Sequence, residues 1–201
     1  CGAHIGLFTV VASRLVGADG RVFSFEPTPA TREVLEKVVA LNDCRNVEVR
    51  PEAVSRTTGT AVFFDTGGEC SNANSLVKLN RHQDGGLTVP TVSIDEFARS
   101  RKLEINCIKI DVEGAEFDLL VGAENTIRNN RPAVYLGLHP NAISHSDASL
   151  SDIWECLRDY NLRVKYHGEF VEKDWFVRQD DLFDVECLPE EAINDERRTL
   201  N

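Results

Sequence analysis

The sequence contains no Met, comparatively few basic residues and no long hydrophobic run. Its 22 Lys and Arg residues are outnumbered by 33 Asp and Glu residues, so the net charge is −11. Because phosphate binding needs clustered Lys and Arg, this excess of acids argues against a nucleic-acid partner and against binding to anionic membrane surfaces. No apolar stretch approaches the roughly 18 residues of a membrane span. The composition therefore predicts no nucleic-acid partner and no membrane span.

The absence of Met also bears on how the chain begins. A reading frame normally starts with Met, whereas the first residue here is Cys1, so we expect a processed or partial chain. No signal-peptide pattern is visible. The six cysteines are scattered singly, without a C-x-x-C pair, and there is no N-x-S/T sequon. This pattern is typical of a reducing compartment, and it predicts a cytoplasmic protein without a disulfide framework.

Helix and strand patterns alternate along the chain, which is typical of an α/β fold with a mainly parallel sheet. The expected helices cover residues 5–16, 28–42, a short stretch from 95, 114–129 and 150–160. The expected strands cover residues 21–25, 46–50, 60–64, 105–112, 133–138, 162–167 and 182–187. In the first helix, the apolar residues that recur on one face are Ile5, Phe8, Ala12, Leu15 and Val16.

The length suits a single domain. We expect this domain to cover residues 1–188 and to be followed by a polar tail over residues 189–201. Residues 65–90 are irregular and rich in Gly, Ser, Asn and Asp. A loop of that length is either a lid over a bound substrate or a plain surface loop. Parallel sheets bind ligands beyond the carboxyl ends of their strands, so site residues are expected there.

A cofactor site is indicated at the start of the chain. Gly2, Ala3 and Gly6 precede the first expected helix, and small residues let backbone amides approach a ligand at a helix N-terminus. Their spacing is G-x-x-x-G rather than the G-x-G-x-x-G of dinucleotide sites. Glu26 follows the next strand, where a carboxylate can accept both hydroxyl hydrogens of a ribose. The two features favour an adenosine-type ligand, with a tight turn and a solvated Glu as the alternatives.

The segment I-K-I-D-V-E-G-A-E at residues 108–116 carries three carboxylates. In a strand, Lys109, Asp111 and Glu113 share one face, although a central parallel strand is normally apolar on both faces. Such departures tend to mark functional sites. Gly114 allows a sharp exit into the next helix, where Glu116 complements the helix dipole. The segment therefore predicts Asp111 and Glu113 as site residues and leaves Glu116 between a site role and a helix-stabilising one.

Four motifs resemble the FkbM family of methyltransferases: C-G-A-H-I-G-L-F-T at 1–9, F-E-P at 25–27, P-E-A-V-S at 51–55 and the segment at 108–116. The resemblance runs from residue 1 to about residue 139. It implies a Rossmann-like class I methyltransferase fold, with a mainly parallel seven-stranded sheet and helices on both faces. It also implies S-adenosylmethionine as the cofactor and O-methylation of a hydroxyl on a sugar, glycan or natural product.

The same resemblance implies roles for individual residues. The implied catalytic residues are Asp111, Glu113 and His139. The implied cofactor-binding residues are Gly2, Ala3, His4 and Gly6 at the methionine part, Glu26 at the ribose, Glu52 and Ala53 at the adenine, and Asp111 at the transferred methyl group.

The chain departs from the family pattern at two places. The family's first strand ends in an acid ahead of the glycine loop, so here that strand and its acid would precede Cys1. We therefore expect a chain extended by roughly ten residues, a strand and its lead-in, to be more stable. The second departure is Gly137, which stands where the family often has Glu.

Methyl transfer to a hydroxyl needs alignment of the two reactants and removal of a proton. We expect Asp111 or His139 to be the general base, with Glu113 orienting the acceptor. Hard cations also bind carboxylates, but the spacing does not demand one, and no metal is predicted. Two alternatives are an NAD-linked Rossmann oxidoreductase and a non-catalytic binding module that has kept the fold.

Overall fold

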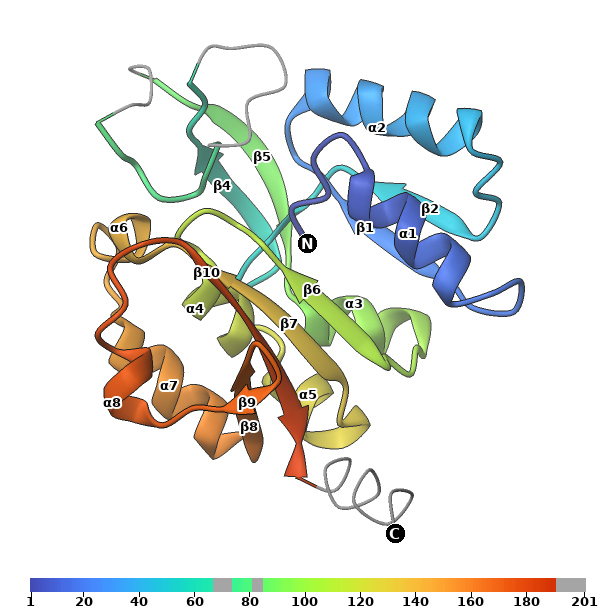
Figure 1. Cartoon of the computed structure of the whole chain (residues 1–201). Coiled ribbons are helices and arrows are strands. Elements are labelled where there is room, and N and C mark those ends of the chain that lie inside the picture. The colour runs from blue at the N-terminus through green and yellow to red at the C-terminus, as the bar shows by residue number, and fades with distance from the viewer. Residues whose placement is uncertain (67–73, 81–84, 191–201) are drawn as a thin grey trace, which may run out of the picture.

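The computed structural model describes residues 1–66, 74–80 and 85–190 (Figure 1). The helices are α1 Leu7–Leu15, α2 Pro29–Leu41, α3 Ile94–Arg101, α4 Glu116–Val121, α5 Glu124–Asn130, α6 Pro140–Ile143, α7 Leu150–Asp159 and α8 Lys173–Phe176. The strands are β1 Val22–Phe25, β2 Val47–Arg50, β3 Ala53–Val54, β4 Gly59–Phe63, β5 Leu87–Val92, β6 Cys107–Ile110, β7 Ala133–Leu138, β8 Leu162–Tyr166, β9 Glu169–Phe170 and β10 Phe183–Pro189.

The described strands form three sheets. The largest has the order β6-β7-β10-β8-β9, in which β6 and β7 are parallel and β10 runs antiparallel to both of its neighbours. Strands β1 and β2 pair in parallel, and β5 pairs in parallel with β3 and antiparallel with β4. In Figure 1, α1 and α2 accompany β1 and β2 on the opposite side of the molecule from α7 and α8. The α/β class is thus confirmed, but the strand pairing is mixed rather than mainly parallel, and a single seven-stranded sheet stays a prediction.

Several elements differ in extent from the sequence-based expectation. The strand expected over 105–112 is shorter, because β6 ends at Ile110. The helix expected over 114–129 is divided into α4 and α5, with Gly122 as the C-cap of the first and Ala123 as the N-cap of the second. Strand β5 begins inside the stretch 65–90 that was expected to be irregular and ends beyond it at Val92, and Gly86 and Pro90 had obscured its pattern. Each difference arises where a Gly or Pro, or a charged run, interrupts the periodicity.

The main hydrophobic core surrounds β6, β7 and β10. Ile110, Leu136 and Leu138 are almost fully buried, and Ile153 and Leu157 of α7 pack into the same cluster. The aliphatic residues of β6 and β7 are buried because helices cover this part of the sheet, as parallel strands require. This core fixes the loops that follow β6 and β7 at one edge of the sheet.

Helix α1 buries the face opposite to its apolar one. Its buried residues are Thr9 and Ser13. The hydroxyl groups of Thr9 and Ser24 are 2.9 Å apart, and the Ser13 hydroxyl donates to Asn46 Oδ1 at 2.5 Å. The apolar residues of α1 and its flanks that stay exposed are Ile5, Leu7, Phe8, Val11, Leu15 and Val16. The helix is confirmed, but its apolar face does not enter the core, because hydrogen bonds hold its polar face on β1.

A groove of about 530 Å³, here called the β1–β6 groove, lies between those two strands and is lined by residues that include Phe8, Phe23, Phe97 and Ile105. Within the described ranges, β1 pairs only with β2 and β6 only with β7. Residues 1–3 join the two strands at one end, since the Cys1 nitrogen donates to Lys109 O at 2.8 Å and the Ala3 N–H donates to Phe25 O at 2.9 Å. A further strand in this groove stays a prediction.

The end of the chain is described as far as residue 190. Strand β10 includes Pro189, so the first residue of the expected tail is part of the sheet, and residues 191–201 lie outside the described ranges. No helix in the described parts of the chain combines the length and the apolar character needed to cross a membrane.

Candidate active site

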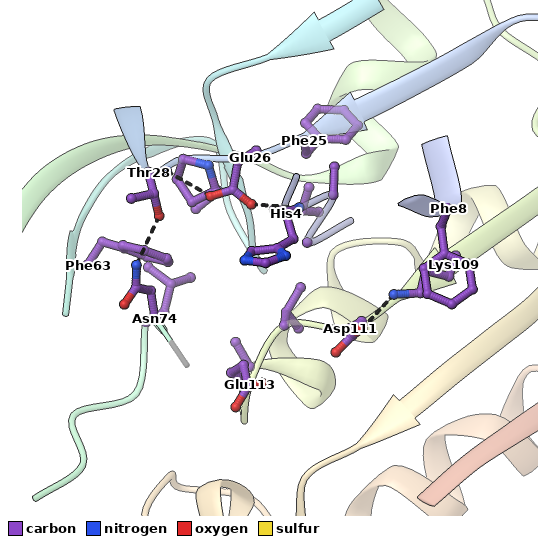
Figure 2. Close-up of a pocket in the computed structure, with 18 of the residues that line it drawn as sticks. His4, Phe8, Phe25, Glu26, Thr28, Phe63, Asn74, Lys109, Asp111 and Glu113 are labelled. Carbon is purple, nitrogen blue, oxygen red and sulfur yellow. Dashed lines mark hydrogen bonds and ion pairs between the residues drawn. The ribbon is translucent and has the colours of Figure 1, made fainter. Parts of the chain in front are cut away.

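A cavity of about 290 Å³ opens at the carboxyl ends of β1, β3, β6 and β7 (Figure 2). It brings together residues that are far apart in the sequence. Nine of the ten residues to which the sequence analysis assigned a role line it: Gly2, Ala3, His4, Glu26, Glu52, Ala53, Asp111, Glu113 and His139. The tenth, Gly6, is the N-cap of α1 and lies outside the lining.

The opening loop has a tightly turned backbone. Gly2, His4 and Gly6 all have positive φ angles, of 70°, 49° and 99°. A side chain at residue 2 is sterically excluded, because a Cβ atom there would lie 1.8 Å from Asp111 O. The glycine therefore lets the opening loop pass directly over the end of β6, where the loop and Asp111 line one cavity.

Glu26 is buried at the end of β1 and lines the same cavity. Its Oε2 accepts the His4 N–H at 3.0 Å, and its Oε1 accepts the Thr28 N–H at 3.0 Å. These two bonds fix the carboxylate against the opening loop, and each carboxylate oxygen keeps further acceptor capacity. A carboxylate with this capacity can accept from two neighbouring hydroxyl groups, and the ribose role of Glu26 stays a prediction.

Glu52 follows β2, and its carboxylate pairs with the Arg50 guanidinium through two contacts, one of them 3.1 Å from Arg50 Nε to Glu52 Oε2. Arg50 Nη1 also donates to Glu48 Oε1 at 3.2 Å. The neighbouring Ala53 is buried in β3. A paired carboxylate and a small apolar residue thus form the rim of the cavity near Glu26.

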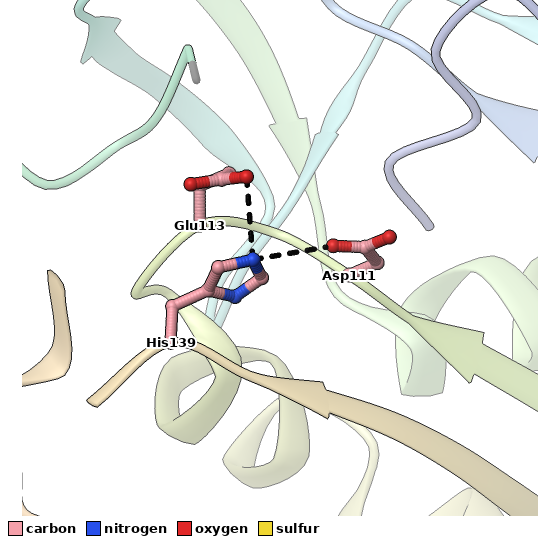
Figure 3. Close-up of side chains that lie close together, drawn as sticks. All are labelled: Asp111, Glu113 and His139. Carbon is pink, nitrogen blue, oxygen red and sulfur yellow. Dashed lines mark ion pairs between the residues drawn. The ribbon is translucent and has the colours of Figure 1, made fainter. Parts of the chain in front are cut away.

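Asp111 and Glu113 lie in the loop after β6 rather than in the strand. Glu113 has a φ of 53° and Gly114 a φ of 104°, so the backbone turns sharply here. The alternation of strand faces that led to the prediction therefore stops at residue 110, and the turn, not the strand, brings the two carboxylates together. Figure 3 shows both side chains directed toward His139.

His139 follows β7 and contacts three carboxylates. Its Nδ1 is 2.8 Å from Glu116 Oε1, and its Nε2 is 3.2 Å from Glu113 Oε1 and 3.6 Å from Asp111 Oδ1. Burial alone lowers the pKa of the imidazole, but hydrogen bonds with Glu113 and Glu116 outweigh it and raise this pKa to about 10. Without a further cation, His139 is therefore a protonated group at neutral pH.

Glu116 is the residue whose role the sequence left open. It is completely buried at the start of α4, and its Oε1 also accepts the Gly114 N–H at 3.0 Å. Its other oxygen, Oε2, has no hydrogen-bond partner among the described residues. A charged side chain in this position is more than a complement to the helix dipole, because it anchors both the turn at Gly114 and the ring of His139.

Lys109 is a site residue to which the sequence analysis gave no role. Its Nζ is 2.6 Å from Asp111 Oδ2 and 4.4 Å from the centre of the Phe8 ring. The sequence already indicated that Lys109 and Asp111 are neighbours, because both were expected on one strand face. Their pairing places a positive charge beside one oxygen of Asp111 and leaves the other oxygen facing His139.

A second group of residues near the cavity comes from the stretch expected to be a lid or a loop. Ser75 is buried, and its hydroxyl donates to Glu113 O at 2.6 Å. Asn74 donates from Nδ2 to Thr28 Oγ1 at 3.3 Å. Residues 67–73 of that stretch lie outside the described ranges. Ser75 helps to hold the unusual backbone at Glu113 from the opposite side of the cavity.

Gly137 lies in β7 directly beside this cluster. A Cβ atom at this position would be 3.7 Å from Asp111 Cγ and 2.9 Å from Oδ1 of Asp184, its cross-strand neighbour. The position is therefore closely packed, because Asp184 and Asp111 already occupy the surroundings that a side chain at residue 137 would need, and Asp184 adds another carboxylate near Asp111.

Comparison with known proteins identifies the family. The family model described as the methyltransferase FkbM domain matches residues 1–164. The chain belongs to this family. The match extends beyond the residue 139 at which the recognisable motifs end, and it includes every residue of the cluster around His139.

A curated relative, the hexuronic acid methyltransferase AglP of Haloferax volcanii, is 27% identical over 158 residues. The match covers 75% of this chain and 61% of the relative, so the chain spans about three fifths of the length of that protein. The names of both the relative and the family describe methyltransferases.

Two solved structures have a similar fold. A methyltransferase FkbM from Methylobacillus flagellatus KT aligns with a TM-score of 0.58 and 16% identity, over 93% of this chain and 42% of its own. A precorrin-6y C5,15-methyltransferase from Geobacter metallireducens GS-15 aligns with a TM-score of 0.52 and 12% identity, over 94% of this chain and 77% of its own. At these identities the likeness establishes the fold alone, and it confirms the Rossmann-like class I methyltransferase fold.

Proposed function

We propose that this FkbM domain transfers a methyl group from S-adenosylmethionine to a hydroxyl oxygen of a carbohydrate acceptor. The observation that carries the proposal is that one cavity joins the opening glycine loop, the buried Glu26 and the carboxylates around His139. The first two suit an adenosine-type cofactor, and the third suits an acceptor that must lose a proton. The family membership favours methyl transfer over the NAD-linked alternative.

The cofactor contacts follow from the position of each element. Glu26 would hold the ribose hydroxyls, and the loop of Gly2, Ala3 and His4 would lie along the methionine part. Glu52 and Ala53 would border the adenine at the other rim of the cavity. In this arrangement the sulfonium would lie between the opening loop and Asp111, where nearby acidic side chains favour a cationic centre.

In the chemical step, the hydroxyl oxygen forms a bond to the methyl carbon while the bond from that carbon to the sulfonium sulfur breaks. The sulfur leaves as a neutral thioether, and the hydroxyl proton passes to a base. We assign this base to Asp111, because its carboxylate is 39% exposed whereas both ring nitrogens of His139 already face carboxylates. Positioning of the reactants lowers the activation barrier by on the order of 7–11 kcal/mol. A general base increases the rate by about 10²–10⁴-fold.

The carbohydrate class of the acceptor is supported by the curated relative, whose name gives hexuronic acid as its substrate. Lys109 provides a positive charge beside Asp111, which would suit an acidic sugar. We therefore take uronic acids and their glycosides as the first acceptors to assay, followed by neutral sugars.

The proposal is tested in two steps. Calorimetry with S-adenosylhomocysteine and with NAD should show binding of the first only, and Glu26→Ala should weaken it. Transfer of a labelled methyl group to the acceptor panel should then occur with the wild-type chain and fall about 10²-fold or more in Asp111→Asn. The affinity for S-adenosylhomocysteine, which lacks the sulfonium charge, should stay unchanged. Binding of NAD alone would favour the oxidoreductase alternative. Binding of S-adenosylhomocysteine without transfer to any acceptor would favour a non-catalytic module.

A further inference from the structure

We propose that Asp111, Glu113 and His139 bind one divalent cation, and that this cation holds oxygen atoms of the acceptor. The cation site is argued from these side chains alone. Its part in positioning the acceptor rests on the proposed function, so the two are tested separately below.

The donor atoms have the spacing that a small cation requires. One ligand atom from each of the three side chains lies within 4.8 Å of the others. His139 Nε2 is 3.2 Å from Glu113 Oε1 and 3.6 Å from Asp111 Oδ1. A cation about 2.1 Å from each donor places neighbouring donors roughly 3–3.5 Å apart. The donor atoms of His139 and Glu113 already have this spacing, and the three side chains would converge on the ion from within 4.8 Å of one another.

The orientation of the imidazole is a second, independent observation. The completely buried Glu116 contacts Nδ1 of His139 at 2.8 Å. A carboxylate that holds one ring nitrogen and directs the other toward a metal is the usual outer partner of a histidine ligand. Burying a carboxylate is costly, and here it directs Nε2 toward Asp111 and Glu113 (Figure 3).

The charge balance also favours a cation of charge two. A histidine ligand is neutral, so Asp111, Glu113 and Glu116 together carry −3, and Lys109, which pairs with Asp111, carries +1. The remaining charge of −2 matches one divalent ion. The two carboxylate ligands favour a hard cation, and Mn²⁺ accepts such ligands together with an imidazole.

The site has room for further ligands. Asp111, Glu113 and His139 all line the cavity, so ligands can reach the three side chains from that side. Two oxygen atoms of a sugar, such as neighbouring hydroxyls or a hydroxyl and a carboxylate, could complete the coordination there. A hydroxyl bound to a cation loses its proton more readily, and it would lie next to Asp111.

The binding test uses the metal-free protein and MnCl₂, without cofactor or acceptor. Calorimetry and Mn²⁺ electron paramagnetic resonance should show one ion per chain. Asp111→Asn and Glu113→Gln should each weaken binding at least tenfold. Asp118→Asn, at a half-exposed carboxylate of α4 that pairs with Arg56, should leave binding unchanged. Glu116→Gln, a positioning residue, should weaken binding by roughly 10–100-fold with an unchanged circular dichroism spectrum. No binding, or binding that survives Asp111→Asn, would overturn the cation site.

The acceptor role has its own readout. Removal of the cation should raise the KM for the sugar by a larger factor than the Kd for S-adenosylhomocysteine. Addition of Mn²⁺ should restore the original KM. Full turnover in the metal-free protein would overturn the acceptor role and leave the proposed methyl transfer intact. Loss of both transfer and S-adenosylhomocysteine binding in the metal-loaded protein would instead count against the proposed function.

Discussion

Helices α1 and α7 both carry apolar residues at helical spacing, but these residues end in opposite environments. The apolar residues Leu150, Ile153 and Leu157 of α7 are buried against the five-stranded sheet. The large apolar residues Leu7, Phe8, Val11 and Leu15 of α1 remain exposed, with Leu15 81% exposed, although that helix also lies on a sheet. The comparison teaches that periodicity identifies a helix and its apolar face, whereas the neighbours available decide whether that face is buried.

The difference originates in the strands that each helix covers. Helix α7 lies against a sheet whose strands β7, β10 and β8 are continuously paired. Helix α1 lies over β1, which borders the open β1–β6 groove. The C-terminal region is therefore a closed core, and the N-terminal region is held by polar contacts such as those of Thr9 and Ser13.

The largest stability effect should come from the closed core. Ile153 is fully buried, so Ile153→Ala removes packed atoms and leaves a cavity, at a cost of about 2–5 kcal/mol. Urea unfolding should show this loss as a lower midpoint with an unchanged slope. A cost below about 1 kcal/mol would mean that α7 packs no better than α1, and the comparison would fail.

The second prediction concerns the groove. A fused segment of roughly ten residues with alternating apolar side chains, placed ahead of Cys1, should continue the path on which Cys1 and Ala3 already bond to β6 and β1. Covering one large apolar side chain contributes about 1.5–3 kcal/mol, and each kcal/mol raises the Tm by about 2–4 °C in a domain of this size.

The control for this experiment is a fused segment of equal length with Pro at alternate positions, which lacks the N–H groups needed for strand pairing. It should melt like the unextended chain. Equal melting temperatures for the alternating segment and the control would show that the groove does not accept a strand.

Sequence reasoning recovered the α/β class and five residues of the cavity from local patterns: a glycine loop, a strand that ends in an acid, and I-K-I-D-V-E-G-A-E. The resemblance to the FkbM family added four more cavity residues, which are His4, Glu52, Ala53 and His139. It missed what depends on distant partners. The buried role of Glu116 requires His139, and the role of Ser75 requires Glu113 O. The mixed strand pairing was not predicted for the same reason, because β10 pairs with two strands that precede it in the chain.

The third prediction compares the two helix starts. Ser149 caps α7 by accepting the Asp152 N–H at 3.2 Å, and Asp152 Oδ2 accepts the Ser149 N–H at 2.9 Å. Helix α1 has Gly6 at this position and no side-chain cap. Ser149→Ala should lower the free energy of unfolding by about 1 kcal/mol. Gly6→Ala instead tests backbone strain, because residue 6 has a φ of 99°.

The cap also has a pH dependence. The hydrogen bond with Ser149 lowers the pKa of Asp152. A carboxyl whose pKa is lower in the folded state stabilises the fold above its unfolded pKa, about 3.9, and this contribution is lost as the pH falls through the folded value. Wild type and Ser149→Ala should therefore converge in stability toward acidic pH. A constant difference between them from pH 7 to pH 3 would contradict the capping assignment.

The smallest effect should come from Leu15 at the end of α1. Its side chain is 81% exposed, so Leu15→Gln removes little buried apolar area, and both residues have good helix propensity. The free energy of unfolding should change by less than about 0.5 kcal/mol. In the extended chain the same substitution reports on the groove. If an added strand also recruits the apolar end of α1, Leu15→Gln becomes destabilising there alone, and α1 then behaves as α7 does.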